Sequence, residues 1–151
     1  MPIMPNQDGW LLARGERDGF PMMVRMAAAY RGLGGLPGFE HHVIVGATLR
    51  SPTPAGFPSS EEGDDLQQFE LNLVAALEVD RESVCVLVIT NHGLRDFIFY
   101  TRDPRGAMKN LEAAAPQLKG FAFEVAVEPD EHWEIYRAFD DWLASPPSKP
   151  N

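Results

Sequence analysis

The clearest hydrophobic pattern in the chain lies between residues 59 and 77. Four apolar residues recur there at intervals of three and four positions: Leu66, Phe69, Leu73 and Leu77. This spacing places apolar side chains on one face of an α-helix. Ser59 and Glu62 precede the stripe and form the Ser-x-x-Glu pattern of a capping box. We therefore predict a core-facing helix that is capped by Ser59.

Two further segments carry helical signals. Asp103 stands before Pro104, and proline is favoured at the first helical position because its missing N–H has no partner there. Asp130 is placed to cap a last helix in the same way. The expected buried faces are Met108, Leu111, Ala115 and Leu118 in the first of these helices, and Trp133, Tyr136, Phe139 and Leu143 in the second.

Strand patterns alternate with these helices. Residues 84–89 form a continuous apolar run, typical of a strand that is buried on both faces. The turn sequence at 91–93 leads into a returning strand at 97–100. Residues 43–49 are rich in β-branched side chains, and residues 121–127 alternate between apolar and other positions. Each of these four segments is predicted to be a strand.

The N-terminal part of the chain has the pattern of a β-hairpin. Residues 10–13 and 20–26 flank the turn cluster 15–19, in which two glycines bracket charged residues. The stretch 22–30 is also rich in Met and Ala, which favour helix. We prefer a strand up to Met26 and leave the following residues open.

The resulting order, β-β-β-α-β-β-α-β-α, predicts an α+β domain. Its middle, residues 43–127, has the β-α-β-β-α-β order of a ferredoxin-like split βαβ core, with an added N-terminal β-hairpin and a C-terminal helix. In the usual strand order of such a core, residues 84–89 form an edge strand, and so apolar an edge promotes aggregation. We expect the hairpin to cover that edge. The predicted domain spans residues 8–144, between flexible termini at 1–7 and 145–151.

Composition narrows the classes of function. A chain of 151 residues, of which 44% are hydrophobic and 23% charged, is typical of one globular domain. Its net charge of −9 disfavours nucleic acid and anionic membrane surfaces, and no apolar run approaches the roughly 20 residues of a membrane helix. A protein partner with a basic patch is favoured by charge complementarity, although acidic charge also serves solubility alone.

The single cysteine excludes an intrachain disulfide and indicates a reducing compartment, so we expect a cytoplasmic protein. Residues 1–8 lack the basic and apolar regions of a signal peptide. Cys85 lies inside an apolar run, where a thiol behaves as a small hydrophobic group. It is not expected to act as a nucleophile.

Three motifs occur in order along the chain. Gly56-Phe57-Pro58 stands before the acidic helix start, an Arg-Asp-x-x-x-Tyr strand runs from Arg95, and Asp130-x-x-Trp-x-x-Tyr begins the last helix. Together they resemble the bacterial DUF695 family of uncharacterised domains, from about Trp10 to Trp142. The family's Glu-Asp-Pro appears here in the order Glu128-Pro129-Asp130.

The resemblance implies a fold but no established activity. Related domains are distantly similar to the regulator of ribonuclease E activity B, an acidic ferredoxin-like protein that inhibits that nuclease. This is a likeness of fold and does not by itself carry a function.

The sequence gives little support for a known catalytic or metal-binding pattern. The adjacent histidines His41 and His42 point to opposite faces of a strand, and neither His92 nor His132 has a second ligand at metal-binding spacing. The glycine-rich segment 32–38 lacks the Gly-Lys-Ser/Thr ending of a phosphate-binding loop. We predict no metal, no cofactor and no catalytic residue.

One group of residues is a candidate binding patch: His92, Arg95, Asp96, Tyr100, Arg102, Trp133 and Tyr136. Trp, Tyr and Arg are enriched at the energetic centres of protein interfaces, and Arg102 is suited to pair with a carboxylate through two hydrogen bonds. The same residue types also anchor a terminal helix onto a core. Both interpretations remain open.

We accordingly predict a non-catalytic, protein-binding or regulatory module. The alternative is an enzyme that acts on a small molecule in a cleft near the glycine-rich loop Gly32–Gly38. The many aromatic side chains of the last helix also raise the expectation of a symmetric homodimer, if one core does not bury them all.

Overall fold

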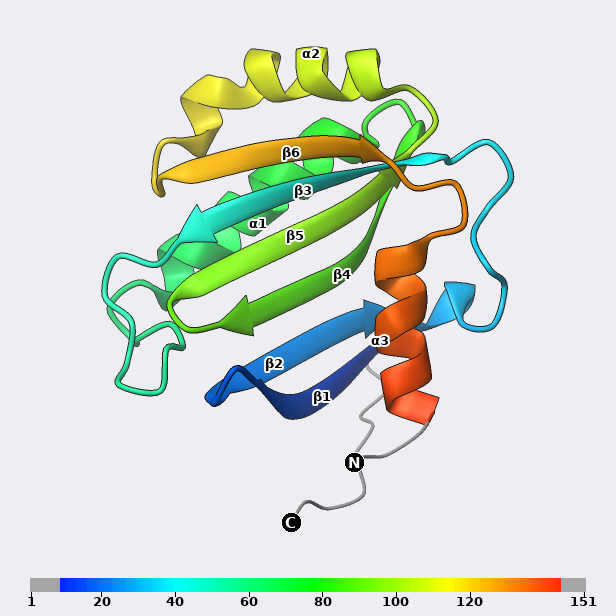
Figure 1. Ribbon diagram of the computed structural model, residues 1–151. Coiled ribbons are helices and arrows are strands. Elements are labelled where there is room, and N and C mark those ends of the chain that lie inside the picture. Colours follow the sequence, from blue (N-terminus) through cyan, green and yellow to red (C-terminus); the bar gives the residue numbers. More distant parts are fainter. Residues whose placement is uncertain (1–8, 145–151) are drawn as a thin grey trace.

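The computed structural model describes residues 9–144 as an α+β fold (Figure 1). Residue 8 and the predicted flexible termini, 1–7 and 145–151, lie outside the described residues. The elements follow the order β1 (Trp10–Arg17), β2 (Phe20–Ala27), η1 (Ala28–Tyr30), β3 (His41–Thr48), α1 (Gly63–Glu78), β4 (Ser83–Asn91), β5 (Leu94–Thr101), α2 (Pro104–Ala114), η2 (Ala115–Leu118), β6 (Phe123–Pro129) and α3 (Glu134–Ala144). The two η elements are short 3₁₀ helices.

All six strands join one antiparallel sheet in the order β1-β2-β4-β5-β3-β6. The N-terminal hairpin adds to β4 through β2, with Met22 opposite Asn91 and Met26 opposite Leu87. The apolar strand β4 is therefore an interior strand, as expected. Covering this edge removes a row of unpaired backbone groups that would otherwise be open to another chain.

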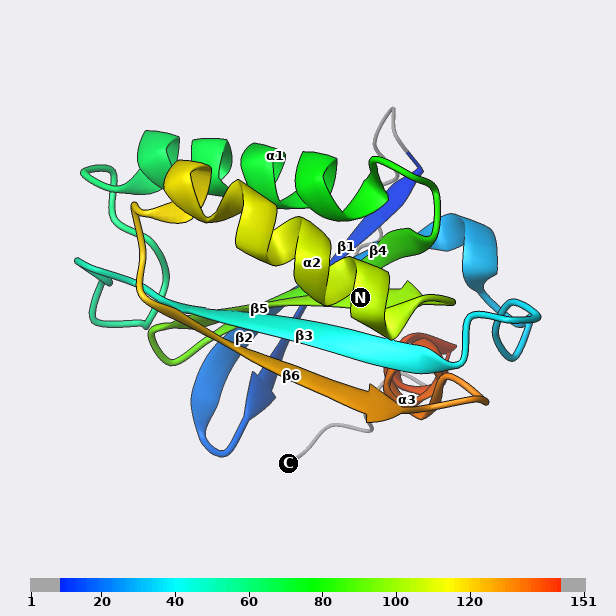
Figure 2. The same ribbon diagram turned by 90° about the horizontal axis from the view of Figure 1, so that it is seen from above.

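The sheet separates two hydrophobic cores, and helices cover both of its faces (Figure 2). Helices α1 and α2 pack on one face over Val43, Val45, Phe97 and Phe99. Helix α3 packs on the other face. Because neighbouring residues of a strand point to opposite faces, Ile98 and Tyr100 of β5 belong to the core beneath α3. Nothing in the described part of the chain is a helix both long and apolar enough to cross a membrane.

Helix α1 buries the predicted stripe, but its predicted cap is wrong. The helix begins at Gly63, and the Ser59 hydroxyl is buried without a hydrogen-bond partner among the described residues. The Glu62 side chain accepts the backbone N–H groups of Arg50 at 2.7 Å and Ser51 at 3.0 Å. The carboxylate thus provides hydrogen-bond acceptors for backbone N–H groups of the loop after β3, and not for those at the start of the helix.

The turns and the other helix ends follow the sequence more closely. The first hairpin turns at Asp18-Gly19 only, a tighter turn than the predicted cluster 15–19, and both residues have positive φ. The second turns at His92-Gly93 in the same way. These are the backbone angles that two-residue hairpins need. Asp103 caps α2 by accepting the Gly106 N–H, as predicted.

Candidate functional site

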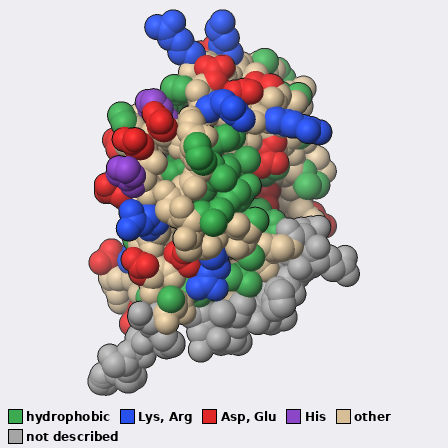
Figure 3. Space-filling model, turned by 90° about the vertical axis from the view of Figure 1, so that its right-hand side faces the viewer, with side chains coloured by type: hydrophobic (Ala, Val, Ile, Leu, Met, Phe, Trp, Pro, Cys, Tyr) green, Lys and Arg blue, Asp and Glu red, His purple; other side chains and the backbone are tan. Residues whose placement is uncertain are grey.

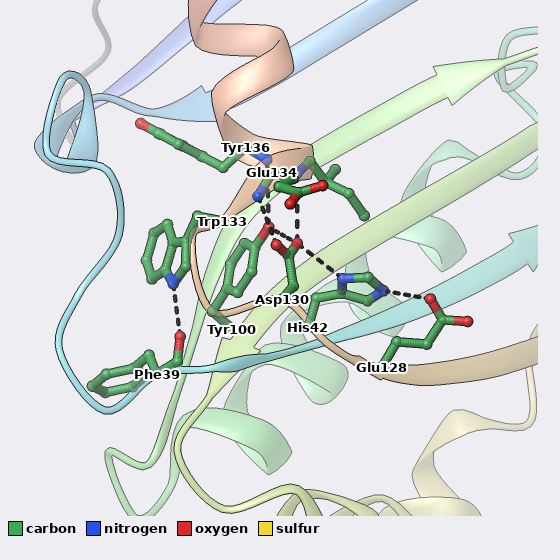
Figure 4. A network of polar contacts seen from close by, with 9 residues as sticks. Phe39, His42, Tyr100, Glu128, Asp130, Trp133, Glu134 and Tyr136 are labelled. Atoms are coloured by element: carbon green, nitrogen blue, oxygen red, sulfur yellow. Dashed lines mark hydrogen bonds and ion pairs between the residues drawn. The ribbon is translucent and has the colours of Figure 1, made fainter.

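The most connected buried polar group is the carboxylate of Asp130, in the turn between β6 and α3 (Figure 4). Its Oδ1 accepts the backbone N–H of Glu134 at 2.7 Å, which caps α3 as predicted. Its Oδ2 accepts the Tyr100 hydroxyl at 2.7 Å and lies 3.1 Å from Nδ1 of His42. One side chain therefore joins β5, β3 and α3.

These contacts favour the ionised form of Asp130. Burial by itself would raise the pKa of this carboxyl, but the hydrogen bonds from Tyr100, Glu134 and His42 outweigh it and leave the pKa below its ordinary value of 3.8. An ionised carboxylate only accepts hydrogen bonds. Nδ1 of His42 consequently carries a proton in this contact, and the opposite nitrogen, Nε2, lies 3.7 Å from the Glu128 carboxylate.

Aromatic rings complete the attachment of α3. Trp133 stacks on Tyr100 with ring centroids 4.1 Å apart, and its indole N–H donates to the Phe39 carbonyl at 2.7 Å (Figure 4). The Tyr136 hydroxyl donates to the Ala27 carbonyl. Burial raises the pKa of both Tyr100 and Tyr136, so both phenols keep their protons and act as donors. The last helix is held by polar anchors inside an apolar core.

Two adjoining hollows open beside this network, and they share Glu131 and His132. The first, of about 470 Å³, is lined by His42, Glu128 and Glu134 among others. The second, of about 320 Å³, lies against the glycine-rich loop and Glu40. We call this region the acidic end, and define it by four exposed carboxylates: Glu40, Glu128, Glu131 and Glu134.

The lining of the two hollows combines carboxylates with two histidines, His42 and His132. Among the described residues that line the two hollows there is no lysine or arginine, and no serine, threonine or cysteine. A histidine held by a carboxylate is an arrangement that also serves general bases, although no hydroxyl or thiol of serine, threonine or cysteine stands beside it among the described lining residues. Figure 3 shows acidic and histidine side chains gathered along the left of this side of the molecule, next to a band of hydrophobic side chains. No cluster of metal-ligating side chains occurs in the part of the chain that the structure describes.

The structure does not bring the seven residues of the predicted patch together. Tyr100, Trp133 and Tyr136 meet beneath α3 and are each at most 1% exposed. Arg102 lies at the same end of β5, where Nε is 3.1 Å from Glu82 and the guanidinium covers the Phe39 ring. His92 lies at the far hairpin, stacked on Phe20.

Arg95 and Asp96 lie at the far end of β5, and their side chains point to opposite faces of the sheet. A single patch of these residues is therefore wrong, because the strand separates its two ends and its two faces. A binding role for any one of them stays a prediction.

The bidentate arginine is Arg25 and not Arg102. Its two terminal nitrogens each donate to Glu70 of α1 at 2.7 Å. Arg95 approaches the same carboxylate at 3.8 Å and donates from Nε to Thr90 at 2.9 Å. Sequence reasoning missed this pair, since Arg25 and Glu70 are 45 residues apart and on elements of different type.

The comparisons with known proteins give one match. A family model described as a family of unknown function, DUF695, matches residues 8–139. The chain belongs to the DUF695 family. No curated protein matches it, and no solved structure does. The more distant likeness to the regulator of ribonuclease E activity B stays a prediction.

The motifs by which the chain resembles DUF695 have clear structural roles here. Asp130, Trp133 and Tyr136 are the polar anchors of α3, and Tyr100 of β5 is the residue they share. Gly56 lies against the backbone of His92, where an added Cβ would be 2.8 Å from the His92 Cα. In this DUF695 domain, these motif residues position elements against one another.

Proposed function

We propose that this DUF695 domain is a non-catalytic binding module that recognises a basic segment of a protein partner at the acidic end. The observation that supports it best is a concave surface with carboxylates and no lysine or arginine among its described lining residues. Such a surface attracts lysine and arginine side chains and speeds their encounter. The hollows have room for individual side chains of the partner.

The fixed frame beneath this surface also supports the proposal. The turn that carries Glu131 and His132 lies between Asp130 and Trp133, which are both buried and hydrogen-bonded. The carboxylates of the acidic end are therefore presented from backbone that the core holds in place. A preorganised surface loses less conformational entropy on binding than a mobile one.

The proposal also includes a finer assignment of fold and location. Strands β4, β5, β3 and β6, with helices α1 and α2 on one face, support a ferredoxin-like split βαβ core. The single cysteine, which is free and buried, supports a reducing, cytoplasmic compartment. Trp133, just before α3, is fully buried, whereas Phe139 and Trp142 of α3 are partly buried and pack on the second core. A homodimer stays a separate prediction.

Charge reversal tests the proposal. The double variant Glu131→Lys/Glu134→Lys changes two exposed side chains of the acidic end. The double variant Glu112→Lys/Glu124→Lys, at exposed positions of α2 and β6, makes the same change of charge elsewhere and is the control. Each tagged protein is used to capture partners from a native lysate at low and high salt, with quantitative mass spectrometry. We expect partners that bind the wild type and the control, are lost with the Glu131→Lys/Glu134→Lys variant, and weaken as salt increases.

The captured partner must then bind as a purified protein through a lysine- or arginine-rich segment. Equal recovery by the Glu131→Lys/Glu134→Lys variant and the control would contradict the proposed surface. Failure to recover any reproducible partner would contradict the binding module itself.

A small-molecule enzyme is the second candidate, since the hollow of about 320 Å³ does lie against the glycine-rich loop. The best-placed acid–base group is His42 in the adjoining hollow of about 470 Å³, where Asp130 holds it. Screening a metabolite library by thermal shift, and then by product formation, tests it. Turnover that is lost in His42→Gln, in a variant that remains folded, would favour the enzyme over the binding module.

A further inference from the structure

A third hollow, of about 480 Å³, lies on the sheet face that α1 covers. We call it the two-arginine hollow, and its lining consists of Arg25, Pro58, Gly63, Leu66, Gln67, Glu70, Leu71 and Arg95. The arginines come from β2 and β5, and Glu70 comes from α1. Strand β4 lies between the two arginine-bearing strands and contributes Thr90 below them. The site is thus built from four separate elements.

The two guanidinium groups differ in how many of their nitrogens have a hydrogen-bond partner. Both terminal nitrogens of Arg25 donate to Glu70. Arg95 donates only from Nε within hydrogen-bond distance, while its Nη1 stands 3.8 Å from Glu70. Within residues 9–144, no hydrogen bond satisfies Nη2 of Arg95. The Arg95 side chain is 17% exposed and lines the hollow, so its remaining donors are available to a ligand there.

The charges around the hollow do not balance. Two guanidinium groups and one carboxylate leave one positive charge on the lining, in a chain whose net charge is −9. Burial lowers the pKa of Arg95, and attraction by Glu70 and Glu62 does not offset this effect. Glu62 already accepts the backbone N–H groups of Arg50 and Ser51. A half-buried guanidinium of this kind gains from an added anion.

We propose that the two-arginine hollow binds a small monocarboxylate, whose carboxylate accepts hydrogen bonds from the terminal nitrogens of Arg95 beside Arg25. Planar bidentate pairing with a carboxylate is what a guanidinium does best. One negative charge neutralises the lining, whereas a phosphate dianion would leave net repulsion against Glu70. Pro58, Leu66 and Leu71 provide an apolar wall for the remainder of the ligand. This site goes beyond the proposed protein-binding surface and does not depend on it.

The test is a titration of the ¹⁵N-labelled full chain by NMR, with hexanoate and benzoate as probes. Hexanamide and benzamide are the uncharged controls, and inorganic phosphate at equal ionic strength is the divalent one. We expect saturable shifts of the backbone amides of residues 63–71 and of the Arg95 side-chain N–H with the carboxylates only. Equal shifts with the amides would overturn the proposal, as would tighter binding of phosphate.

Variants separate recognition from general charge. Arg95→Gln is expected to weaken carboxylate binding by about tenfold or more, the loss expected for a charge-assisted hydrogen bond. Arg50→Gln, which removes an exposed arginine paired with Asp65 outside the hollow, leaves the affinity unchanged. If Arg95→Gln fails to fold, Gln67→Glu provides the second variant, since it adds a negative charge at an exposed lining position. Undiminished binding in either folded variant would overturn the proposal.

Discussion

The hydroxyl of Tyr100 on β5 donates a hydrogen bond of 2.7 Å to Oδ2 of Asp130, the residue that caps α3. This single contact connects the middle of the sheet to the start of the last helix. It is buried on both sides, with Tyr100 fully buried and Asp130 8% exposed. Its loss leaves a buried carboxylate with one hydrogen-bond partner fewer.

Tyr100→Phe is therefore expected to destabilise the protein by about 1–3 kcal/mol, the range for removing a partner of a buried charged group. Chemical denaturation followed by tryptophan fluorescence and by circular dichroism measures the change. Tyr30→Phe is the control, because among the described residues the Tyr30 hydroxyl has no hydrogen-bond partner. A Tyr100→Phe change no larger than that of Tyr30→Phe would show that the contact does not contribute to stability.

The pH dependence of stability follows from Asp130. The pKa of this carboxyl in the folded protein is below its ordinary value of 3.8, so its contribution is fully present above that value. It is lost as the pH falls through the depressed folded value. Urea denaturation of the wild type should show a falling free energy of unfolding below a pH of about 4.

Asp130→Asn removes this titration, so we expect a variant that is less stable at neutral pH and loses less stability on acidification. Glu131→Gln, at the adjacent exposed position, is the control. If wild type and Asp130→Asn lose stability in parallel below a pH of about 4, the acid sensitivity belongs to other carboxyls.

The pKa of Asp96 is shifted in the direction opposite to that of Asp130. Burial raises the pKa of this carboxyl, and attraction by Arg17 offsets only part of the effect. Ionisation of Asp96 consequently costs stability in the folded protein. Asp96→Asn should raise the melting temperature at neutral pH. The gain should vanish as the pH falls below the ordinary aspartate value of 3.8, where the wild type is protonated in both folded and unfolded states.

Differential scanning calorimetry across this pH range measures the effect of Asp96→Asn. Asp141→Asn, at an exposed position of α3, should leave the melting temperature nearly unchanged throughout. A lower melting temperature for Asp96→Asn at neutral pH would mean that the carboxylate has a stabilising partner that outweighs its burial.

The buried carboxylate of Glu62 provides the fourth prediction. Both of its oxygens accept backbone N–H groups in the loop after β3, and the residue is 1% exposed. Glu62→Gln replaces one acceptor oxygen by an NH₂ donor, which faces a backbone N–H in place of a lone pair. We expect a loss of about 1–3 kcal/mol in the free energy of unfolding. Glu61→Gln, next to it and exposed, is the matched control and should be neutral.

Hydrogen exchange locates the Glu62 effect. The Arg50 and Ser51 amides should exchange faster in Glu62→Gln than in the wild type, since they lose a charged acceptor. Unchanged protection of these two amides would indicate that other groups hold this loop.

The elements themselves were largely predictable. The stripe from Leu66 to Leu77 is buried as expected, the hairpins turn at Asp18-Gly19 and His92-Gly93, and Asp130 caps the last helix. The prediction for Ser59 failed because the carboxylate of a capping box can accept from any backbone N–H group within its reach. Glu62 reaches the Arg50 and Ser51 amides instead, and their position depends on how β3 leaves the sheet.

The candidate patch depends on which side chains are exposed, and the sequence alone did not provide this information. The three motifs by which the chain resembles DUF695 were visible, but their residues served packing more than surface chemistry. Tyr100 and Trp133 are 33 positions apart and stack in the core. Tyrosine, tryptophan and arginine have the same preferences in interfaces and in buried anchors. Only burial distinguishes the two roles, and burial is a property of the folded chain.

The sequence by itself determined the order of helices and strands, because periodicity, turn residues and caps act over a few positions of the backbone. It also determined the acidic charge that favours a basic partner. The tertiary structure alone decided which distant groups meet: His42 and Asp130, 88 positions apart, and Arg25 and Glu70, 45 positions apart. The reason is physical. Such partners are brought together by the order of the strands in the sheet and by the packing of helices on it, which join segments far apart in the chain.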